Sequence, residues 1–598
     1  MDIRSMAVSR PLLTYSTLSS IFAFFALSPS PSLIATIGLI SIIRVSAWVF
    51  AHRRGGAASA FTQIVAISIF AGLAQLSPSL QALSNPTTSL VVLGGISVLT
   101  TSLATFVAFC ASYIERQISS PWVKLTLFPA LWATAWGFIS YVSPVGQLAT
   151  WSPVVGLGPY LWLRQYLGQW GINWVAGAWA SICAVMIGNW IVGTPDDEEK
   201  VAPLVEVPQD NERLAEEQPG ASRGVNIVNS HSKETLVSLL IVLMIPSWLS
   251  TNTPLPSFSD ETTPFGIGCA LPIPRHSGQR SGLPTLDDYI YDSRTLQMHA
   301  DVVVWPESAV RFTSPTAKAD AFREMQLPKN INRGKYWGVS FEEYIPADLG
   351  DGVFKKGSTR NGFALLGSSG PPVLEYYKRN LVPVAESFPL VPGTEDPGAF
   401  TIQLKAPKNY NKSDWAPAPN YTRPIPVTTS ICLDLATSQS FSHLESRPSL
   451  ILAPAKTWHI GIGLAMWEQA KARAHETGST VIWCDGGEGG VSGVAGGGYE
   501  QYTQVGQGSF YKTIGISYPF NEKRTVYARG GQSAAFWTAW AIVGLGYAIE
   551  GLSKHDRPQA GNSLEGRSIL RLGHLVTSLR SIFRGNEVQA GESRPLLE

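Results

Sequence analysis

The 598-residue sequence carries little charge: Asp, Glu, Lys and Arg make up 15% of it, whereas about 25% is usual in soluble proteins. Its 45 basic and 44 acidic residues almost cancel, which leaves a formal net charge of +1. Nucleic-acid binding needs a basic surface, so we expect no nucleic acid among the partners. Cysteine is also scarce, and five cysteines in a chain of this length do not form a disulfide framework.

Long apolar stretches dominate the amino-terminal third of the sequence. A helix that spans a bilayer needs about 20 mostly apolar residues, and the sequence predicts about eight such helices. They lie near residues 11–28, 33–51, 57–76, 89–114, 122–142, 173–193, 235–250 and 534–551. The first follows Arg4 and Arg10, as the core of a signal peptide would. No small-residue cleavage site comes after it, so we expect an uncleaved helix.

The charge of the loops predicts the orientation in the membrane. Basic residues occur at the amino terminus, near residues 52–54 and 116–124, and after the last span, whereas loops 29–32 and 77–88 carry no charge. Basic loops remain in the cytoplasm. The sequence therefore predicts a membrane domain of seven helices over residues 1–250, an exterior domain over 251–533, a last helix over 534–551 and a basic cytoplasmic tail over 552–598. Residues 196–234 are acidic and contain several prolines, which predicts a disordered cytoplasmic loop.

Arg44 lies inside the second apolar run. A charge within a membrane span is a candidate functional residue by default. A long basic side chain can also extend along the helix to the polar interface, and we favour this second interpretation, with Arg44 reaching the cytoplasmic side.

The exterior segment 251–533 is long enough to bury a core of its own. Short apolar runs at 302–305, 363–366, 428–433, 450–453 and 481–484 have the length of strands and are bounded by turn residues. Between the last two, residues 458–477 are typical of a helix that ends at Gly478. Strands that alternate with a helix predict an α/β domain.

Three clusters of reactive side chains follow strand-like runs. The first is Val-Val-Val-Trp-Pro-Glu307, where a carboxylate beyond a buried strand is a candidate general base. The second runs from Tyr-Tyr-Lys378 to Glu386, and the third is Ser-Ile-Cys432, with a candidate nucleophile at the end of a strand. Each alone also fits a buried thiol, a surface carboxylate or a solvated lysine; their combination and order favour a catalytic site.

In this order, the clusters resemble the motifs of the nitrilase, or carbon–nitrogen hydrolase, superfamily. With the flanking spans, the sequence looks most like the membrane branch of that superfamily, the apolipoprotein N-acyltransferases. Residues 302–309 match the motif that carries the general base, 376–389 the lysine motif with its second glutamate, and 430–434 the nucleophile motif. Residues 472–478 and 525–531 agree as well, so the resemblance covers the membrane layout and most of residues 265–550.

This resemblance implies a four-layer αββα catalytic domain on a helical membrane domain. Glu307 would deprotonate Cys432, Lys378 and the backbone N–H of Leu433 would stabilise the oxyanion, and Glu386 would assist as the second glutamate. The family moves an acyl chain from a phospholipid donor to the cysteine as a thioester and then to an amine. The acceptor here would be a protein amino terminus or an amino lipid. We expect no cofactor and no metal, and a monomer.

The sequence also departs from the family. Residues 455–459 read Ala-Lys-Thr-Trp-His where the family usually has an Asn-Asp pair before Trp-Phe, which makes Trp458 and His459 candidates for the substrate wall. Leu433 replaces an aromatic residue, and Asp434 replaces the usual glutamate. These changes leave the catalytic set intact and leave the acceptor open.

Two glycosylation sequons, Asn411-Lys-Ser and Asn420-Tyr-Thr, fall on the expected exterior side. With the divergent sequence, they favour a eukaryotic protein of the endoplasmic reticulum or secretory pathway with a luminal catalytic domain; a bacterial protein would lie in the plasma membrane and face outward. Cys269 and Cys484 are candidates for a disulfide in such a compartment, but we favour two separate buried thiols.

Three other functions remain open. A membrane-anchored amidase, in which water resolves the acyl-enzyme, would use the same residues. A scaffold built on an inactive nitrilase domain is less favoured because all four catalytic candidates are present. Transport is poorly supported because, apart from Arg44, the spans are almost free of charge.

Overall fold

The computed structural model describes residues 3–51, 53–192, 230–249, 253–274, 283–346, 357–408, 410–437 and 439–555. Residues 1–544 form one compact unit, and a second begins at Leu545. The acidic loop expected at 196–234 lies outside the described residues up to position 229. The basic tail expected at 552–598 lies outside them from position 556.

The first half of the described chain is helical. The helices are α1 (Ile3–Ser9), α2 (Pro11–Ala26), α3 (Leu33–Phe50), α4 (Gly56–Ala74), α5 (Leu76–Leu80), α6 (Pro86–Gln117), α7 (Pro121–Val142), α8 (Arg164–Val192), α10 (Ser230–Val242) and α11 (Ile245–Leu249). Two short 3-10 helices, η1 (Gly146–Ala149) and η2 (Gly158–Leu163), join α7 to α8. The chain returns to helix at its carboxyl-terminal end with α16 (Val526–His555).

Within the residues that the structure describes, six helices are long and apolar enough to cross a membrane, which indicates a membrane protein. They are Leu33–Phe50, Gly56–Ala74, Pro86–Gln117, Pro121–Val142, Gly158–Val192 and His231–Leu249. Two of the eight expected spans, near residues 11–28 and 534–551, are not among these six helices. Helix α2 has only 16 residues, because the Ser-Pro-Ser-Pro sequence after Leu27 cannot continue a helix. Helix α16 is not among the six; its Trp, Tyr, Thr and Gly residues dilute its apolar character.

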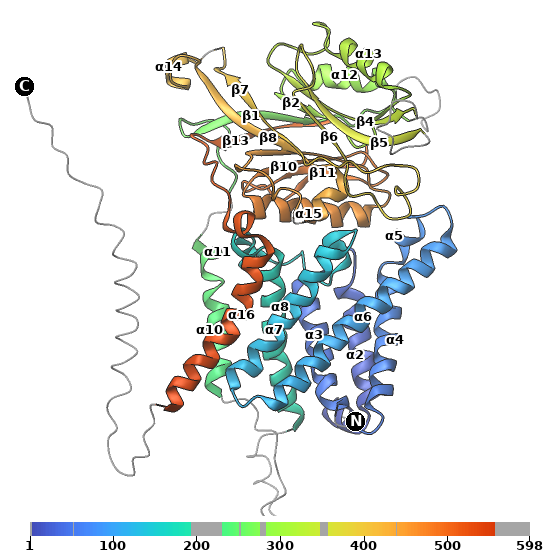
Figure 1. Ribbon diagram of the computed structural model, residues 1–598, viewed down its shortest axis with the longest axis vertical. Helices are drawn as coiled ribbons and strands as arrows, with labels where there is room; N and C mark the ends of the chain where they lie inside the picture. The colour runs from blue at the N-terminus through green and yellow to red at the C-terminus, as the bar shows by residue number, and fades with distance from the viewer. Residues whose placement is uncertain are drawn as a thin grey trace, which may run out of the picture. The chain divides into compact units, whose positions relative to one another are not determined.

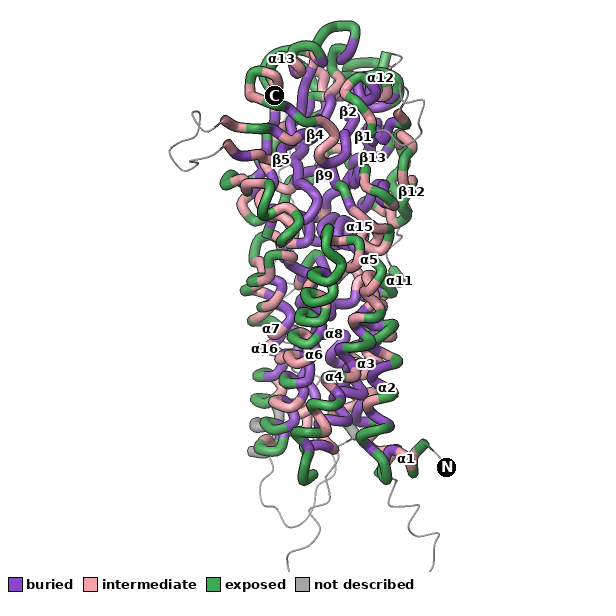
Figure 2. The backbone as a smooth tube through the Cα atoms, turned by 90° about the vertical axis from the view of Figure 1, so that its right-hand side faces the viewer, coloured by how far each residue is buried: buried purple, intermediate pink, exposed green. Residues whose placement is uncertain are grey.

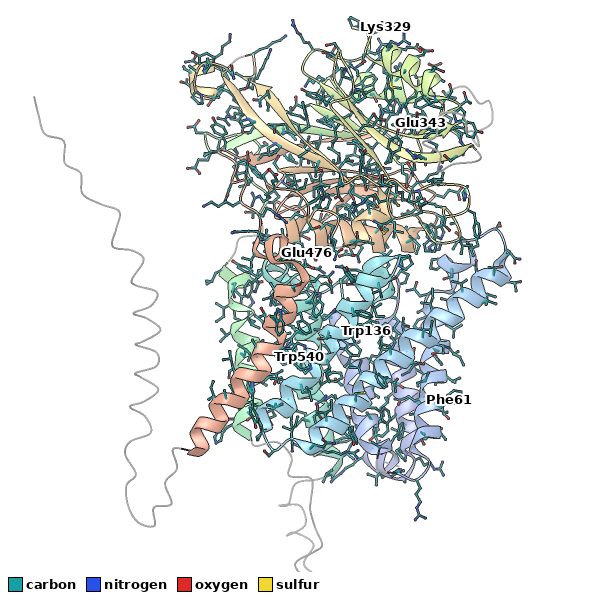
Figure 3. All side chains as sticks on the ribbon, in the orientation of Figure 1. Phe61, Trp136, Lys329, Glu343, Glu476 and Trp540 are labelled. Carbon is teal, nitrogen blue, oxygen red and sulfur yellow. A yellow bond between two sulfur atoms is a disulfide. The ribbon has the colours of Figure 1, made fainter. Side chains whose placement is uncertain are left out.

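The outer faces of these helices are apolar and exposed. Phe61 of α4 is 67% exposed and Leu99 of α6 is 71% exposed, and Figure 3 labels Phe61 on the outer side of the helical layer. Figure 2 shows the same division as green outer turns and purple inner turns along the helices. Large apolar side chains that face outward all along a helix bundle are typical of a surface in contact with lipid.

Arg44 is buried in the helical bundle, and its expected reach to the cytoplasmic interface stays a prediction, because its partners Glu115 and Lys124 flank the basic 116–124 connection. Arg44 is 1% exposed and its guanidinium forms an ion pair with Glu115 of α6, with 2.8 Å between Nη2 and Oε1. The guanidinium also lies over the rings of Trp48 and Phe128, 5.1 and 4.5 Å from their centroids. A carboxylate on a neighbouring helix neutralises the charge inside the bundle.

The second half of the described chain forms two sheets. One contains seven strands in the order β13-β1-β2-β4-β5-β6, with β3 beside β4, and the other contains six in the order β12-β11-β10-β9-β8-β7. The strands are β1 (Thr262–Cys269), β2 (Val302–Val304), β3 (Val310–Phe312), β4 (Tyr336–Ile345), β5 (Ser358–Leu366), β6 (Leu374–Tyr377), β7 (Ala399–Lys405), β8 (Thr422–Thr429), β9 (Leu450–Ala455), β10 (Thr480–Asp485), β11 (Val491–Ala495), β12 (Tyr502–Val505) and β13 (Phe510–Ser517).

The sheets pack face to face, with helices on both outer faces. Ile267 and Val304 of the first sheet share one buried core with Val427 and Ile482 of the second. Helices α12 (Leu286–Leu296) and α13 (Pro315–Met325) share a core with the outer face of the first sheet, and α15 (Ile460–Thr477) packs on β10 and β11 of the second. The domain is therefore an αββα sandwich, as Figure 1 shows.

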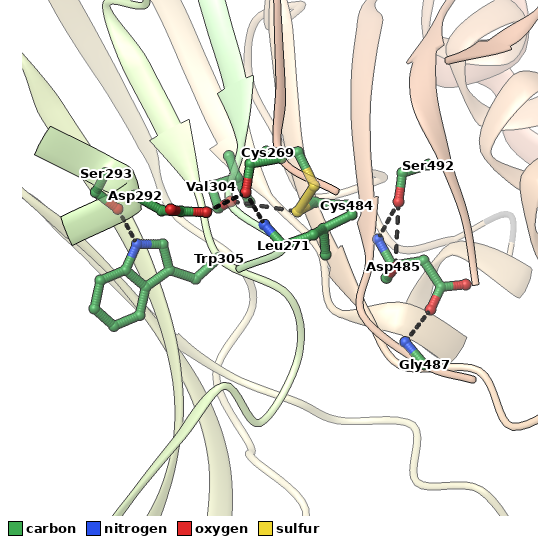
Figure 4. Close-up of a disulfide and its surroundings, with 11 residues drawn as sticks. Cys269, Leu271, Asp292, Ser293, Val304, Trp305, Cys484, Asp485, Gly487 and Ser492 are labelled. Carbon is green, nitrogen blue, oxygen red and sulfur yellow. Dashed lines mark hydrogen bonds between the residues drawn. A yellow bond between two sulfur atoms is a disulfide. The ribbon is translucent and has the colours of Figure 1, made fainter. Parts of the chain in front are cut away.

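A disulfide links the two sheets, so the expectation of two separate thiols at these positions is wrong. Cys269 ends β1 and Cys484 lies in β10, with 5.5 Å between their Cα atoms. Figure 4 shows the bond spanning the interior of the sandwich. The sequence did not reveal it because the pairing depends on how the two inner faces meet, and the cysteines are 215 residues apart.

Helix α15 connects the sandwich to the helical domain. Glu476 near its carboxyl end accepts a hydrogen bond from Arg164 of α8 at 3.3 Å. Before its first turn, the Trp458 indole donates to the carbonyl oxygen of Pro78 in α5 at 3.0 Å. The neighbouring His459 ring hydrogen-bonds the Ser77 hydroxyl at 3.1 Å. Polar contacts at both ends of α15 thus hold the αββα sandwich against the helical domain.

Candidate active site

The reactive residues predicted from the sequence follow three strands, two in the first sheet and one in the second. Glu307 follows β2 and Lys378 follows β6 in the first sheet, and Cys432 follows β8 in the second. Glu386 lies in the loop after β6. The sheets pack with these strand ends together, so residues more than 120 positions apart converge on one buried cluster of charge and sulfur.

Lys378 lies at the centre of the cluster. Its ammonium Nζ is 2.7 Å from Oε1 of Glu307 and 2.8 Å from the Glu386 carboxylate. Glu307 and Lys378 are 3% and 1% exposed, respectively. The second carboxylate is held in turn, because Glu386 accepts the backbone N–H of Val382 at 2.8 Å. Two carboxylates and one ammonium leave a local excess of negative charge beside the thiol.

A further buried side chain completes the cluster, and sequence reasoning missed it. The side chain of Asn361 in β5 donates through Nδ2 to Oε1 of Glu307 at 2.7 Å. The backbone carbonyl oxygen of Asn361 accepts the backbone N–H of Lys378 at 2.9 Å. Strands β5 and β6 are antiparallel neighbours. Asn361 therefore fixes both members of the Glu307–Lys378 pair from the adjoining strand. No signal in the sequence marks it, since it lies mid-strand without a motif.

Cys432 begins a short 3-10 helix, η4 (Cys432–Ala436), directly after β8. Its φ is +45°, a left-handed conformation that non-glycine residues rarely adopt and that occurs where a functional side chain must be presented at a fixed angle. The first N–H groups of a helix have no partner within it. The N–H of Leu433, the second residue of η4, is at such a position, and its role toward an oxyanion stays a prediction.

Charges in the cluster set the proton distribution. Burial raises the pKa of Cys432 well above that of an ordinary thiol, and the Glu307 carboxylate raises it further. Burial also raises the pKa of Glu307, against the attraction of Lys378. Burial alone would lower the pKa of Lys378, but the neighbouring carboxylates outweigh it and raise the pKa. The resting cluster therefore holds a neutral thiol beside a carboxylate whose proton affinity is increased.

Asp434, the replacement for the usual glutamate, joins the cysteine loop to the lysine loop. Its carboxylate accepts the Tyr376 hydroxyl at 2.8 Å and both the backbone N–H and the side-chain amide of Asn380 at 2.8 Å. Asp434 is 1% exposed. The nucleophile turn and the lysine motif are thus held in one hydrogen-bonded arrangement across the two sheets.

A second buried aspartate shapes the loop that covers the sulfur. The backbone N–H of Lys456 lies near the Cys432 thiol and acts to lower its pKa, against the effect of burial, and the carbonyl oxygen of Ala455 accepts the Glu307 N–H at 3.2 Å. Asp485 at the end of β10 accepts the Thr457 N–H at 2.9 Å and the Thr457 hydroxyl at 2.7 Å. Figure 4 shows Asp485 also accepting the N–H of Gly487.

The remaining predicted residues lie away from this cluster. The polar atoms of Trp458 and His459 bond to α5 of the helical domain, as described above, so their role as a substrate wall stays a prediction. Asn411 and Asn420 are both exposed. Asn411 precedes the short helix α14 (Lys412–Trp415). Among the residues that the structure describes, no group of three or more His, Cys, Asp or Glu side chains is arranged to hold a metal ion.

Comparison with solved structures returns members of the nitrilase superfamily. The chain is similar to Nit3 of Saccharomyces cerevisiae, a member of branch 10 of the superfamily, at 14% identity over 43% of this chain and 93% of that one, with a TM-score of 0.30. It is similar to an amidase from Nesterenkonia sp. at 15% identity over 47% of this chain and 98% of the amidase, with a TM-score of 0.30.

A mutant of the Nesterenkonia sp. AN1 amidase matches at 14% identity over 47% of this chain and 98% of the amidase, with a TM-score of 0.31. In that structure the acetamide moiety of fluoroacetamide is covalently added at the active-site cysteine. No family model and no curated sequence matches this chain. The architecture itself, a set of membrane-length helices joined to an αββα sandwich, comes from the strand order and the packed cores of this chain.

Proposed function

We propose that this protein is a membrane N-acyltransferase that transfers an acyl chain from a phospholipid, through a thioester on Cys432, to an amine. One observation carries the proposal: Glu307, Lys378, Glu386 and Cys432 form one cluster in a domain bonded to the membrane-length segment that contains α8. A long-chain donor stays in the bilayer, since each buried CH₂ contributes about 0.8 kcal/mol. An active site in a domain held on membrane helices is suited to reach that donor.

The first half-reaction forms the thioester. Glu307 takes the proton of the Cys432 thiol as sulfur attacks the ester carbonyl of the phospholipid. The Lys378 ammonium and the N–H of Leu433 stabilise the resulting oxyanion. The carbon–oxygen bond to glycerol then breaks, Glu307 returns its proton to the leaving alkoxide, and a lysophospholipid departs.

The second half-reaction resolves the thioester. An amine attacks the acyl carbon, Glu307 accepts a proton from the nitrogen, and the carbon–sulfur bond breaks as the amide forms. The thiolate regains its proton from Glu307, which restores the resting cluster. Thioesters remain reactive toward amines, so this route needs no cofactor.

Trapping the acyl-enzyme tests the proposal. The full chain in detergent would be supplied with a phospholipid bearing an alkyne-tagged acyl chain, and the protein examined for label that hydroxylamine removes. We expect such label on the wild type and none on Cys432→Ala; Cys110→Ala, at a free cysteine within α6, serves as the matched control and should label normally. Absence of label from every variant would contradict a phospholipid donor.

Acceptor dependence separates this proposal from the membrane-anchored amidase. If adding amines to the labelled enzyme speeds loss of the label and yields an amide product, the transferase is supported. If the label is lost to water at the same rate with or without amine, the hydrolase is supported instead. The presence of all four reactive side chains, Glu307, Lys378, Glu386 and Cys432, disfavours an inactive scaffold.

We further propose that the αββα domain faces the lumen of the endoplasmic reticulum or secretory pathway. The Cys269–Cys484 disulfide supports an oxidising compartment. The exposed sequons at Asn411 and Asn420 lie on the same domain.

A further inference from the structure

A cavity of about 640 Å³ lies where α7, α8, α15 and α16 meet. This volume is in the range of about 300–1,000 Å³ typical of pockets that hold small organic ligands. Glu307, Lys378, Glu386 and Cys432 do not line it. Figure 3 labels Glu476, one of its lining residues, at the junction of the sandwich and the helical layer. The cavity is thus separate from the candidate active site.

The wall on the membrane side is aromatic and open outward. Phe138 and Tyr141 of α7 line it and are 61% and 60% exposed, on helices whose outer faces are apolar. Trp170 of α8 and Phe536 of α16 form the inner part of this wall, with an edge-to-face contact at 6.0 Å between ring centroids. Apolar groups in the bilayer can therefore enter between α7 and α16.

The wall on the sandwich side is charged and buried. Arg473 and Glu476 of α15 line it, and their side chains are 1% and 3% exposed. Glu476 receives Arg473 at 2.8 Å and Arg164 at 3.3 Å, so two guanidinium groups share one carboxylate. The next carboxylate on this helix, Glu468, pairs with Lys471 at 2.7 Å. Arg164, Arg473 and Glu476 together therefore carry an excess of one positive charge at the end of an apolar cavity.

Arg473 also retains hydrogen-bonding capacity. Its Nη atoms face the Glu476 carboxylate, at 2.8 and 2.6 Å, whereas its Nε makes no hydrogen bond to any residue that the structure describes. A buried guanidinium donor without an acceptor is costly. An anionic oxygen would satisfy it, and arginine is well suited to phosphate. Gln439 and Ser442 also line the cavity, and the Ser442 hydroxyl donates to the Gln439 carbonyl oxygen at 2.9 Å.

A glycine makes room for the cavity. At Gly531, α16 leaves helical geometry with φ +58° and ψ −156°, a conformation that residues with a Cβ rarely adopt. The helix therefore changes direction beside the cavity, which Gly531 lines. The bend separates the first residues of α16 from the rest of that helix.

We propose that this cavity binds a membrane phospholipid, with its phosphate at Arg473 and its acyl chains between α7 and α16. Basic pockets between membrane helices bind lipid head groups, and an aromatic opening toward the bilayer suits the chains of the same molecule. The Gln439–Ser442 segment begins seven positions after Cys432 in the chain. A lipid in the cavity would therefore contact the segment that follows η4, the short helix that begins at Cys432.

Photolabelling tests the site directly. The full chain carrying Cys432→Ala would be reconstituted in phosphatidylcholine nanodiscs with a diazirine-bearing phosphatidylcholine, and the crosslinked peptides mapped. We expect label concentrated on residues 134–141 of α7 and 528–536 of α16. A diacylglycerol with the same diazirine chain should label these segments several-fold less, because it lacks the phosphate. Because Cys432 is absent, the result does not depend on thioester formation.

Two matched substitutions on α16 refine the test. Ser533 lines the cavity and Thr538 does not, and both are exposed hydroxyl residues. Ser533→Trp fills the cavity and should reduce the specific label about tenfold, whereas Thr538→Trp should leave it unchanged. Label spread evenly over all membrane helices, equal label from diacylglycerol, or equal effects of the two substitutions would each overturn the proposal.

Discussion

At the scale of single residues, the cluster keeps the nucleophile protonated until substrate arrives. Two carboxylates share Lys378, and together with burial they raise the pKa of Cys432. A free thiolate at rest would be exposed to oxidation and alkylation. A neutral thiol beside a base of increased proton affinity avoids this, since the proton moves only as the carbon–sulfur bond forms.

Replacing Glu307 should therefore separate thiol reactivity from catalysis. In Glu307→Gln, the negative charge beside Cys432 is lost while Lys378 stays positive, so the pKa of the thiol falls. We expect alkylation of Cys432 by iodoacetamide to become about tenfold faster at pH 8, as one pKa unit implies, while thioester formation is lost. Rates would be followed by mass spectrometry against pH; slower alkylation in Glu307→Gln would contradict this charge arrangement.

Asn361 should act on the base and not on the substrate. Its amide donates to the Glu307 carboxylate, which favours the charged form, so Asn361→Ala raises the pKa of Glu307 further. The acidic limb of the pH–rate profile for thioester formation should move to higher pH, and the maximal rate should fall about 10- to 100-fold. Asn330→Ala removes another buried asparagine, which bonds to Glu324, and should leave the profile unchanged. An unshifted limb in Asn361→Ala would refute this positioning role.

At the scale of elements, the strand ends explain what the sequence could predict. The glutamate, lysine and cysteine each follow a strand inside a recognisable motif, and the structure brings them together. Asn361 and Asp485 stayed hidden because their contacts come from the neighbours of β5 and β10, and no local pattern records which strands lie side by side. The disulfide was missed for the same reason: it depends on the packing of two sheets. The ion pair of Arg44 depends likewise on α6 lying against α3.

The loop held by Asp485 should be essential for catalysis without being essential for folding. Asp485→Asn keeps the size of the side chain but removes its charge. Its Oδ1 can still accept the Thr457 N–H, whereas its amide nitrogen faces the Thr457 hydroxyl, which has to turn from donor to acceptor, so the loop beside Cys432 is held less firmly. We expect thioester formation to fall about 10- to 100-fold with the melting temperature reduced only slightly. Asp301→Asn, at a carboxylate that pairs with Lys335 on the first sheet, is the control. Full activity in Asp485→Asn would show that this loop geometry is not needed.

At the scale of the whole molecule, the sandwich and the helices are joined by polar contacts at both ends of α15. The Arg164–Glu476 pair is buried at one end, and Trp458 and His459 bond to α5 at the other. A buried ion pair breaks at a cost of about 3–5 kcal/mol when one partner is removed. Separation of the two layers would therefore break this buried pair as well as the bonds of Trp458 and His459 to α5.

The sidedness of the sandwich can be read from its sequons. Expressed in a eukaryotic host, the protein should carry glycans removable by a glycosidase that releases N-linked chains, because a luminal domain presents the exposed Asn411 and Asn420 to the transferase. The mass shift on digestion should shrink in Asn411→Gln or Asn420→Gln and vanish in the double variant. A chain without any shift, combined with access of the sandwich to protease from the cytoplasmic side, would reverse the proposed orientation.

The Arg44–Glu115 pair has a consequence for biosynthesis. The two residues are 71 positions apart, so at about 5–20 residues per second of synthesis the arginine waits about 4–14 s for its carboxylate. During that interval α3 carries an uncompensated charge into the bilayer. The neutralisation of Arg44 in the folded bundle therefore cannot be completed before the last turns of α6 have been synthesised.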